Sequence, residues 1–555
     1  MPKHKFKIDK SMMTFAVFVL AGLLVYSSSI AQAADKDPEL VRAARQGDLK
    51  EVIRLLDQGL DINAKNGDGQ TALMAAARGK DLEKVKLLVD KGANLEAKDD
   101  TSQTALQHAA WAGNLEMVKL LIEKGADVNA RSLGDMTVLM CAAQGGNNLD
   151  VVKLLIEKGA DTKATTNIGR TVLMAAAGGG NLELVKFLIE KGLDVNAKND
   201  SGGTILMSAG YGGNLDLVKF LIEKGLDVNA RDEDGHTALM AAGYGGNLDV
   251  VKFLIGKGLD VNARDNIGTT VLMNAAWAGN LDVVKLLIDR GGDVKVRDKQ
   301  GRTVLMNAAE RGNLEVAKLL IEKGADVKAR DQYGRTVLMA AAEGRNLDLV
   351  KLLIEKGLDV SAEDTLGRTV LMHAAERGNL EVVRRLIEKG ADVKDTGHSG
   401  GTVLMSAAKG GNLDLVKFLI DRGLDVKAGD RYGQTVLMCA AQTWKNLDVV
   451  KLLIDKGADA NSEDMTGQTA LMKAAELGNL AIVKFLIEKG ADVNAKENSP
   501  VSPGKWRVLR SLVRSFIDKK FSVVVEGKGR TALKIAQEEG HKEIVEYLKA
   551  HGAEE

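Results

Sequence analysis

Apolar and polar residues follow one pattern that repeats about every 33 residues along most of the chain. In one copy, residues 166–198, the segment TVLMAAA at 171–177 forms a first, short apolar block. In a second block, Leu182, Val185 and Leu188 recur at the spacing of one helical face, and charged residues fill the opposite face. The pattern predicts two short helices in each copy, each with one apolar side.

Capping residues predict where each helix begins and ends. The hydroxyl of Thr171 can cap the start of the first helix, and Asn181 can cap the second. Gly169 lies in a tight turn before the first helix, and Gly192 suits the left-handed residue that ends the second. The stretch LDVNAKND then predicts an extended return to the next copy.

The capping threonine marks thirteen close copies of the repeat. The spacing is 33 residues except at two steps of 34, where one extra residue in the same turn predicts a surface loop. Two helices of this length cannot bury their apolar sides alone, whereas stacked neighbours can, so the pattern predicts a solenoid. The capping threonines are Thr71, Thr104, Thr137, Thr171, Thr204, Thr237, Thr270, Thr303, Thr336, Thr369, Thr402, Thr435 and Thr469.

The repeat resembles the ankyrin repeat. The segment DEDGHTALMAAGYGGNLDVVKFLIGKGLDVNA (232–263) and its copies carry the resemblance, from about residue 37 to the end of the chain. It implies an all-α, ankyrin-type solenoid of about sixteen helix-turn-helix repeats with hairpin-like loops, in a curved stack. It also implies a concave surface formed by the loops and first helices, and a role in binding other proteins rather than in catalysis.

The repeat divides the chain into five parts. Residues 1–33 are interpreted as a signal peptide, 34–69 as an N-terminal capping repeat, 70–498 as thirteen ankyrin-like repeats, 499–528 as a degenerate basic repeat, and 529–555 as a C-terminal capping repeat. The capping repeats are more polar, as the ends of a solenoid require. For residues 499–528, a protruding insertion is the alternative to a shortened repeat.

The N-terminal residues have the composition of an export signal. Lysines between Lys3 and Lys10 precede an apolar run from Met12 to Tyr26, and the small-residue site at 31–33 predicts cleavage before Ala34. We expect an exported, periplasmic protein of bacterial type, with an extracellular location or an uncleaved inner-membrane anchor as the alternatives. The apolar run is shorter than the roughly 20 residues of a membrane span, so membrane association is less favoured.

The charge balance argues against a nucleic-acid-binding protein, and the cysteine positions argue against a disulfide within the chain. The 76 basic and 76 acidic residues balance, which gives no electrostatic footprint for nucleic acid. Cys141 and Cys439 occupy the same position of repeats far apart in the stack, so they cannot form a disulfide within one molecule. We expect a monomer that packing alone stabilises.

Known catalytic and metal-binding patterns are absent from the sequence. The seven histidines form no HExxH motif and no cluster with zinc spacing. GHSGG at 397–401 and the recurring DVNA segments match repeat loops better than a serine nucleophile or a calcium loop. We therefore expect no enzymatic activity, no cofactor and no metal.

The candidate site lies at positions that vary between repeats. Position +7, seven residues after the capping threonine, lies on the concave side if the ankyrin resemblance holds, and exposed rings there would be binding hot spots. Arginines occur at position −1, just before the threonine, and tyrosines at hairpin tips. The alternative is that the rings pack on neighbouring hairpins and the charges pair among themselves. The partner-binding candidates are Trp111, Tyr211, Tyr244 and Trp277 at position +7, Arg302, Arg335 and Arg368 at position −1, and Tyr333 and Tyr432 at the tips.

A second candidate lies in the degenerate segment, where KWRVLRSLVRSFIDKKF at 505–521 reads as a basic amphipathic helix. Such a helix binds an acidic partner or an anionic membrane surface, and the alternative is a distorted repeat whose apolar side packs on its neighbours. Its candidate residues are Trp506, Arg507, Arg510 and Arg514.

Methionine occupies position +3 of twelve repeats, as Met174 does. The ankyrin family usually has histidine there, within Thr-Pro-Leu-His, and that histidine bonds the loops of adjacent repeats. The thioether predicts apolar packing in place of that bond. The methionines are too widely spaced, roughly 10 Å per layer, to ligate one soft metal ion together.

Overall fold

The structure, a computed structural model, describes residues 38–145, 148–444, 446–497 and 529–554. These residues form thirty α-helices in fifteen antiparallel pairs, with isolated bridges instead of strands. The predicted all-α repeat solenoid is confirmed. The contacts divide the chain into two compact units, unit 1 ending at Asp293 and unit 2 beginning at Val294.

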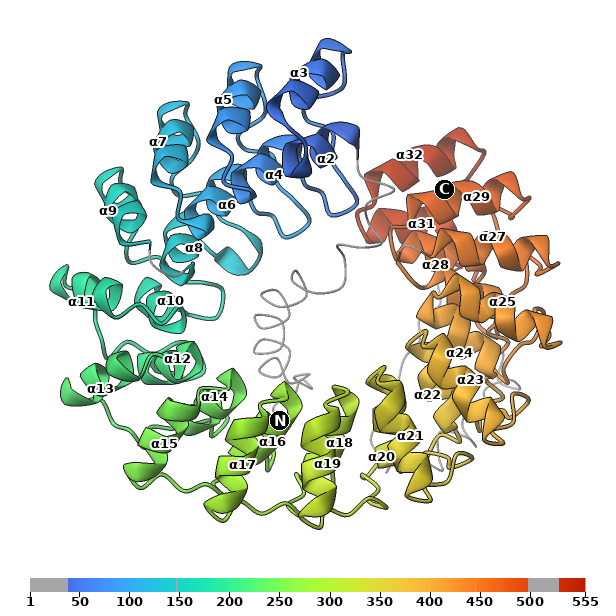
Figure 1. Ribbon diagram of the computed structural model, residues 1–555. Helices are drawn as coiled ribbons and strands as arrows, with labels where there is room; N and C mark the ends of the chain where they lie inside the picture. Colours follow the sequence, from blue (N-terminus) through green and yellow to red (C-terminus); the bar gives the residue numbers. More distant parts are fainter. Residues whose placement is uncertain (1–37, 146–147, 445, 498–528, 555) are drawn as a thin grey trace, which may run out of the picture. The chain divides into compact units, whose positions relative to one another are not determined.

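Within each unit, the first helices of the repeats form one row and the second helices another (Figure 1). The helices of unit 1 are α2 Glu39–Gln46, α3 Leu49–Asp57, α4 Ala72–Arg78, α5 Leu82–Asp90, α6 Ala105–Ala112, α7 Leu115–Glu123, α8 Val138–Gln144, α9 Leu149–Glu157, α10 Val172–Gly178, α11 Leu182–Glu190, α12 Ile205–Gly212, α13 Leu215–Glu223, α14 Ala238–Gly245, α15 Leu248–Gly256, α16 Val271–Ala278 and α17 Leu281–Asp289, with a 3₁₀ turn at Leu133–Asp135. The helices of unit 2 are α18 Val304–Glu310, α19 Leu314–Glu322, α20 Val337–Glu343, α21 Leu347–Glu355, α22 Val370–Glu376, α23 Leu380–Glu388, α24 Val403–Gly410, α25 Leu413–Asp421, α26 Val436–Ala441, α27 Leu447–Asp455, α28 Ala470–Glu476, α29 Leu480–Glu488, α31 Ala532–Glu538 and α32 Lys542–Ala550.

The predicted capping residues begin the helices. The hydroxyl oxygen of Thr171 accepts from the Met174 amide at 3.2 Å, and the side-chain oxygen of Asn181 accepts from the Leu184 amide at 2.9 Å. Gly192 has a φ of 86°, which a residue with a Cβ rarely adopts. Each cap satisfies a backbone donor that the helix leaves without a partner, which is worth about 1 kcal/mol.

An acidic or amide side chain holds most hairpins in shape, as Asp331 does. Its Oδ1 accepts from the amides of Tyr333 and Arg335, each at 2.9 Å. Successive hairpins are joined by a backbone bond, such as the Gln332 amide to the Gln300 carbonyl at 2.8 Å. Neighbouring repeats are therefore held in a fixed register at their tips.

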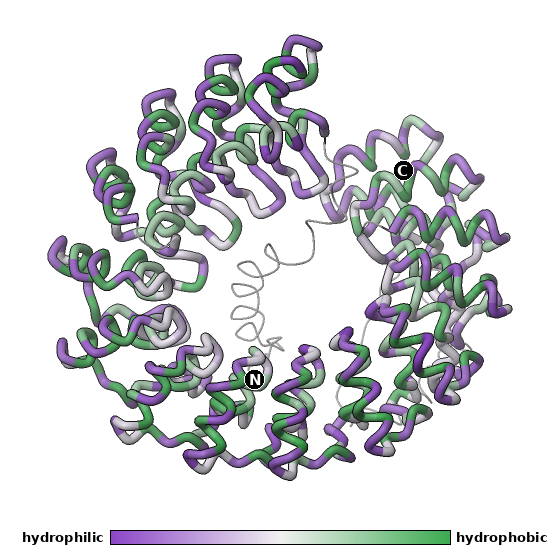
Figure 2. Tube along the Cα trace, viewed as in Figure 1, coloured by the Kyte–Doolittle hydropathy of each residue, from purple (hydrophilic) through white to green (hydrophobic). Residues whose placement is uncertain are grey.

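The core is a thin layer between the two helix rows of each unit. Val185 and Leu188 on the second helix are fully buried, as are Ala176 and Ala177 on the first. Figure 2 shows the apolar residues concentrated in the helices and the polar residues in the turns and loops. Burying one such Val or Leu contributes about 1.5–3 kcal/mol, so the repeats are stabilised by many equal contributions along the stack.

The methionines at position +3 are buried, with no more than 9% of any of them exposed. In several repeats the sulfur also accepts a weak hydrogen bond, as between the Thr71 amide and the Met74 Sδ at 3.4 Å. Gln107 stands at this position in one repeat, and its Nε2 donates to the Met136 carbonyl of the next repeat at 2.9 Å. Gln107 thus bonds to the next repeat, whereas the methionines at this position pack in the core.

The C-terminal repeat is the next layer after α28 and α29. The Asn494 side chain donates to the Gly552 carbonyl at 3.0 Å, and the same bond joins Asn461 to Gly490 one layer earlier, also at 3.0 Å. Arg530 bonds Glu497 in the same junction. The two repeats that flank the segment from 498 to 528 are therefore direct neighbours. The predicted degenerate repeat, which the count of about sixteen includes, lies outside the described residues, as does the predicted signal peptide.

Candidate functional site

Three rings at position +7 of unit 1 stack on one another. The centroids of Tyr211 and Tyr244 are 6.1 Å apart, with 30° between the ring planes, and those of Tyr244 and Trp277 are 5.2 Å apart, with 25°. The rings come from the ends of α12, α14 and α16, and each is partly exposed. We call Tyr211, Tyr244 and Trp277 the aromatic row.

Glycine at position +6 brings these helices close enough for the rings to stack. Gly210 and Gly243 hold this position, which is alanine in the other close repeats. A Cβ on Gly210 would lie 2.6 Å from the Ala238 carbonyl oxygen, and one on Gly243 would overlap the Val271 side chain. The closeness of α12, α14 and α16 therefore depends on the missing side chains.

The backbone of the aromatic row is also fixed. The Asn247 side chain donates to the Tyr211 carbonyl at 2.8 Å, and the Asn280 side chain donates to the Tyr244 carbonyl at 3.1 Å. The rings are thus presented from a rigid framework, which reduces the entropy that binding would cost.

Trp111 lies apart from the aromatic row. Its side chain is 45% exposed at the end of α6, and Gln144 and Gly178 hold position +7 in the repeats between it and Tyr211. The structure therefore brings together three of the four predicted rings and leaves Trp111 as a separate exposed residue.

An arginine that the sequence analysis missed lies in the repeat that precedes Tyr211 and packs against it. Arg170 is at position −1, and its guanidinium donates to the Gln144 side-chain oxygen at 3.4 Å and the Met174 carbonyl at 3.5 Å. Burial raises the pKa of the Tyr211 hydroxyl, and the charge of Arg170 opposes that shift. The sequence signal that could have identified Arg170 was its position just before Thr171, which matches the position of Arg302 before Thr303.

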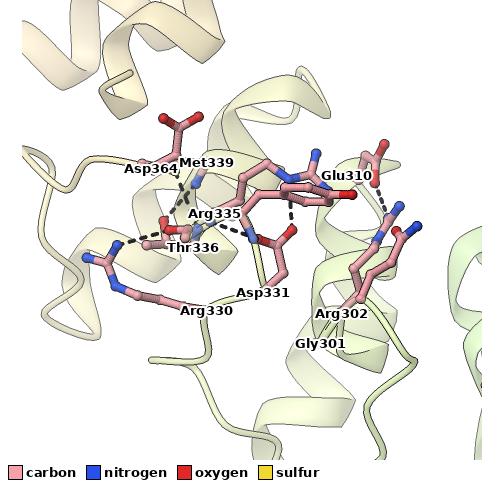
Figure 3. Close-up of polar contacts among 12 residues, drawn as sticks. Gly301, Arg302, Glu310, Arg330, Asp331, Arg335, Thr336, Met339 and Asp364 are labelled. Atoms are coloured by element: carbon pink, nitrogen blue, oxygen red, sulfur yellow. Dashed lines mark hydrogen bonds and ion pairs between the residues drawn. The ribbon is translucent and has the colours of Figure 1, made fainter. Parts of the chain in front are cut away.

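The predicted arginines of unit 2 are paired with carboxylates. Arg302 bonds Glu310 and, at 2.9 Å, the Asn307 side chain. The Nε of Arg335 lies 2.9 Å from the Asp331 Oδ2, and its Nη1 lies 4.0 Å from the Glu343 Oε1. Figure 3 shows these side chains turned toward one another along the hairpins and first helices.

Arg368 repeats this arrangement one layer further on. It contacts Asp364 at 2.9 Å and Glu376 at 3.5 Å, and Glu376 in turn accepts from Lys409 at 2.7 Å. Each of the three candidate arginines is therefore paired with a carboxylate of its own repeat and does not stand as a single charge.

A buried histidine, also missed, joins two layers of these pairs. His373 Nδ1 lies 2.8 Å from the Glu343 Oε1, and Nε2 lies 3.2 Å from the Asp364 Oδ2. Burial disfavours the charged imidazole, but the hydrogen bonds to Asp364 and Glu343 outweigh it and raise the pKa of His373. Although burial acts in the opposite direction, His373 and Arg377 lower the pKa of Glu343 to about 2.

We call this network the charge ladder. Carboxylate oxygens only accept hydrogen bonds, so a histidine between two of them donates from both nitrogens and is protonated. The members of the charge ladder are Arg302, Glu310, Asp331, Arg335, Glu343, Asp364, Arg368, His373 and Glu376.

The tyrosines predicted at hairpin tips are exposed. Tyr333 is 50% and Tyr432 44% exposed, and Leu366, at the same position of an intervening repeat, is 55% exposed. Leu366 carries no ring, so the tyrosines at this position gave no signal for it in the sequence. Nothing in the described residues covers these three side chains. The basic candidates Trp506, Arg507, Arg510 and Arg514 lie outside the described residues.

The described residues were also compared with the requirements of metal binding, thiol reactivity and membrane spanning. No three His, Cys, Asp or Glu side chains there are grouped closely enough to hold a metal ion. Burial raises the pKa of the Cys141 and Cys439 thiols to about 12, which keeps them unreactive. No helix of this part of the chain has the length and apolar composition needed to cross a membrane.

Comparison with protein-family models shows which family the chain belongs to. Models described as "Ankyrin repeats (3 copies)" match residues 40–132, 139–232, 173–265, 206–298, 272–364, 346–430, 371–464 and 404–497. A model described as "Ankyrin repeats (many copies)" matches residues 112–156, so the matches together run unbroken from 40 to 497. No curated protein sequence matches the chain. The repeat, its caps and its helix pairs thus agree with the family comparison, and the chain belongs to the ankyrin repeat family.

Proposed function

We propose that this protein is a non-enzymatic scaffold that binds a partner protein through the face of unit 1 that carries the aromatic row, the concave face in an ankyrin array. Ankyrin repeats are generally protein–protein interaction modules, and ankyrin repeat proteins are generally scaffolds rather than enzymes. The observation that carries the proposal is the stack of Tyr211, Tyr244 and Trp277.

Aromatic rings held in a rigid, partly exposed array are the side chains that most often dominate binding energy. Tyr and Trp provide a large contact area at a small cost in conformational entropy, and their polar ends tolerate solvent when no partner is present. The charge ladder of unit 2 is less suited to this task, because a partner would have to break pairs such as Arg368–Asp364 before gaining contacts of its own.

Co-purification tests the proposal. The full chain is used to capture partners from the native source, in parallel with a variant carrying Tyr211→Ala, Tyr244→Ala and Trp277→Ala. The control carries Tyr333→Ala and Tyr432→Ala, which removes exposed rings elsewhere. We expect the first variant to lose the partner and the control to keep it. Capture of the same partner by the first variant would refute the site.

We further propose that the protein acts outside the cytoplasm, in the periplasm, as a monomer. The basic and apolar N-terminal sequence and the site before Ala34 support export. Sequencing the N-terminus of the protein recovered from each cell fraction is the test. A protein that begins at Met1 and stays in the cytoplasm would contradict the proposal.

A further inference from the structure

Arginine recurs at position −1 of five repeats, and in four of them it pairs with a glutamate eight residues later. The pairs are Arg302–Glu310, Arg335–Glu343, Arg368–Glu376 and Arg530–Glu538. The fifth arginine is Arg170, and the residue eight places later is Gly178. This repeat therefore keeps the cation and lacks the usual partner.

The residue four places before the arginine, which supplies a second carboxylate in other repeats, is also uncharged in the repeat of Arg170. Arg335 and Arg368 contact the aspartates four residues before them, Asp331 and Asp364. Thr166 stands at the corresponding place before Arg170 and uses its hydroxyl to accept from the Arg170 amide at 3.1 Å. No carboxylate of the described residues forms an ion pair with Arg170.

The guanidinium of Arg170 occupies the space that the glutamate would take. A Cβ on Gly178 would lie 2.7 Å from the Arg170 Nη2. Its two hydrogen bonds, to the Gln144 side chain and the Met174 carbonyl, go to neutral oxygens at 3.4 and 3.5 Å. Burial lowers the pKa of Arg170 to about 10, since no nearby carboxylate compensates for it. The side chain still keeps part of its surface exposed.

A cation surrounded by protein without a counter-charge is costly, and buried charges in proteins are normally paired. Such a group is retained without a structural benefit when a ligand supplies the missing charge, as at binding sites. The Arg170 guanidinium lies over Gly178, which holds position +7 in the repeat before Tyr211, and α10 packs against α12. A molecule that covers the rings and extends by one repeat therefore reaches the guanidinium.

Resting on the function proposed above, we propose that Arg170 binds a carboxylate of the partner protein, from an acidic side chain or a C-terminus, that adjoins the apolar residues lying on the aromatic row. Arginine suits this task because its planar fork forms two parallel hydrogen bonds with a carboxylate. A single guanidinium matches the single charge of a carboxylate, whereas a phosphate dianion would call for a cluster of cations.

Paired peptide arrays test the inference with the full chain. One array holds short peptides of apolar and aromatic residues with one Asp, Glu or free C-terminus. The matched array replaces these with Asn, Gln or a C-terminal amide. We expect the protein to bind the acidic peptides at least about tenfold more tightly, because the charged hydrogen bonds form away from bulk water. Arg170→Gln removes this preference and keeps the remaining affinity.

The variant lacking all three rings separates this inference from the proposed function. It loses binding to both arrays if the aromatic row is the binding surface. Equal binding of both arrays by the unaltered protein, or a preference that survives Arg170→Gln, overturns the role of Arg170 and leaves the aromatic row as the site. Binding of neither array by the unaltered protein contradicts both proposals.

Stability gives an independent test. Arg170→Met removes an unpaired cation, so we expect the unfolding midpoint in urea to rise, whereas Arg335→Met breaks an internal pair and lowers it. Gly178→Glu supplies the carboxylate found in the other four repeats and is expected to remove the preference for acidic peptides. Gly256→Glu, where no neighbour approaches a Cβ, is the matched control. A fall in the midpoint for Arg170→Met, or an unchanged preference in Gly178→Glu, overturns the inference.

Discussion

The aromatic row of unit 1 and the charge ladder of unit 2 share position +7 of the repeat, which carries rings in one unit and glutamates in the other. Position +7 holds Tyr244 in one unit and Glu343 in the other, and the fold is unchanged because neither side chain belongs to the core between the helix rows. In unit 1 the rings contact each other and solvent, and in unit 2 the charges satisfy each other. A repeat scaffold can therefore carry exposed rings in some repeats and a stabilising network in others at one shared position.

The largest expected effect comes from His373, which joins two layers of the charge ladder. His373→Leu leaves Glu343 and Asp364 buried without their shared cation, and breaking such a buried pair costs about 3–5 kcal/mol. Urea unfolding of the full chain measures the loss. His398→Leu is the control, since that side chain is 65% exposed. Equal stability of the two variants would show that the charge ladder does not stabilise unit 2.

The aromatic row should be more sensitive to helix spacing than to charge. Gly210→Ala places a Cβ 2.6 Å from the Ala238 carbonyl oxygen, so α12 and α14 must separate, at a cost of about 1–3 kcal/mol. We expect weaker partner binding together with lower stability. Gly256→Ala meets nothing within 4 Å and should be neutral or slightly stabilising. Unchanged partner binding by Gly210→Ala would mean that ring stacking is not needed.

The charge ladder also predicts a pH dependence that the aromatic row lacks. The raised pKa of His373 contributes stability that is complete below its ordinary pKa of 6.5 and is lost as the pH rises through the folded value. The lowered pKa of Glu343 contributes stability that is present above 4.5 and is lost as the pH falls through about 2.

The stability difference between the unaltered protein and His373→Leu should therefore be greatest between pH 4.5 and 6.5 and decline on both sides. Each pKa unit of difference between the folded and unfolded states corresponds to about 1.4 kcal/mol. Thermal unfolding across this range measures it. A difference that is constant with pH would contradict the protonated, doubly bonded histidine.

The smallest effect is expected for the exposed pairs on the second helices of unit 1. Lys186 lies 2.9 Å from Glu183, but both side chains are well exposed, so Lys186→Ala should change stability by less than about 0.5 kcal/mol. The same urea titration serves as the measurement. A loss comparable to that of His373→Leu would show that pairing matters more than burial.

The repeat determined how much of the fold was predictable from the sequence. Thr171 and Asn181 identified the helix starts and Gly192 a helix end, because caps depend on local geometry that a single residue type satisfies. The stacking of the C-terminal repeat directly on α28 and α29 was not the favoured prediction, which placed a degenerate repeat between them. Similarity between segments does not determine which repeats are neighbours.

The candidate site was harder to predict from the sequence than the fold. Tyr211, Tyr244 and Trp277 were found as rings at one position, but their stacking depends on Gly210 and Gly243, whose effect appears only when helices meet. His373 was missed because its two carboxylates come from different repeats, Asp364 from the hairpin of its own repeat and Glu343 from α20 of the preceding one. Arg170 was overlooked because it differs from the other arginines only in a residue that is missing. Gly178 stands where the repeat of Arg335 has Glu343, and only a comparison of the two repeats reveals this.

Hydrogen exchange on the full chain, with and without its co-purified partner, tests the central claim most directly. We predict that the partner slows exchange in α12, α14 and α16, which carry the aromatic row, and leaves α18, α20 and α22 of the charge ladder unchanged. Protection of the charge-ladder helices with none in α12, α14 and α16 would contradict the account.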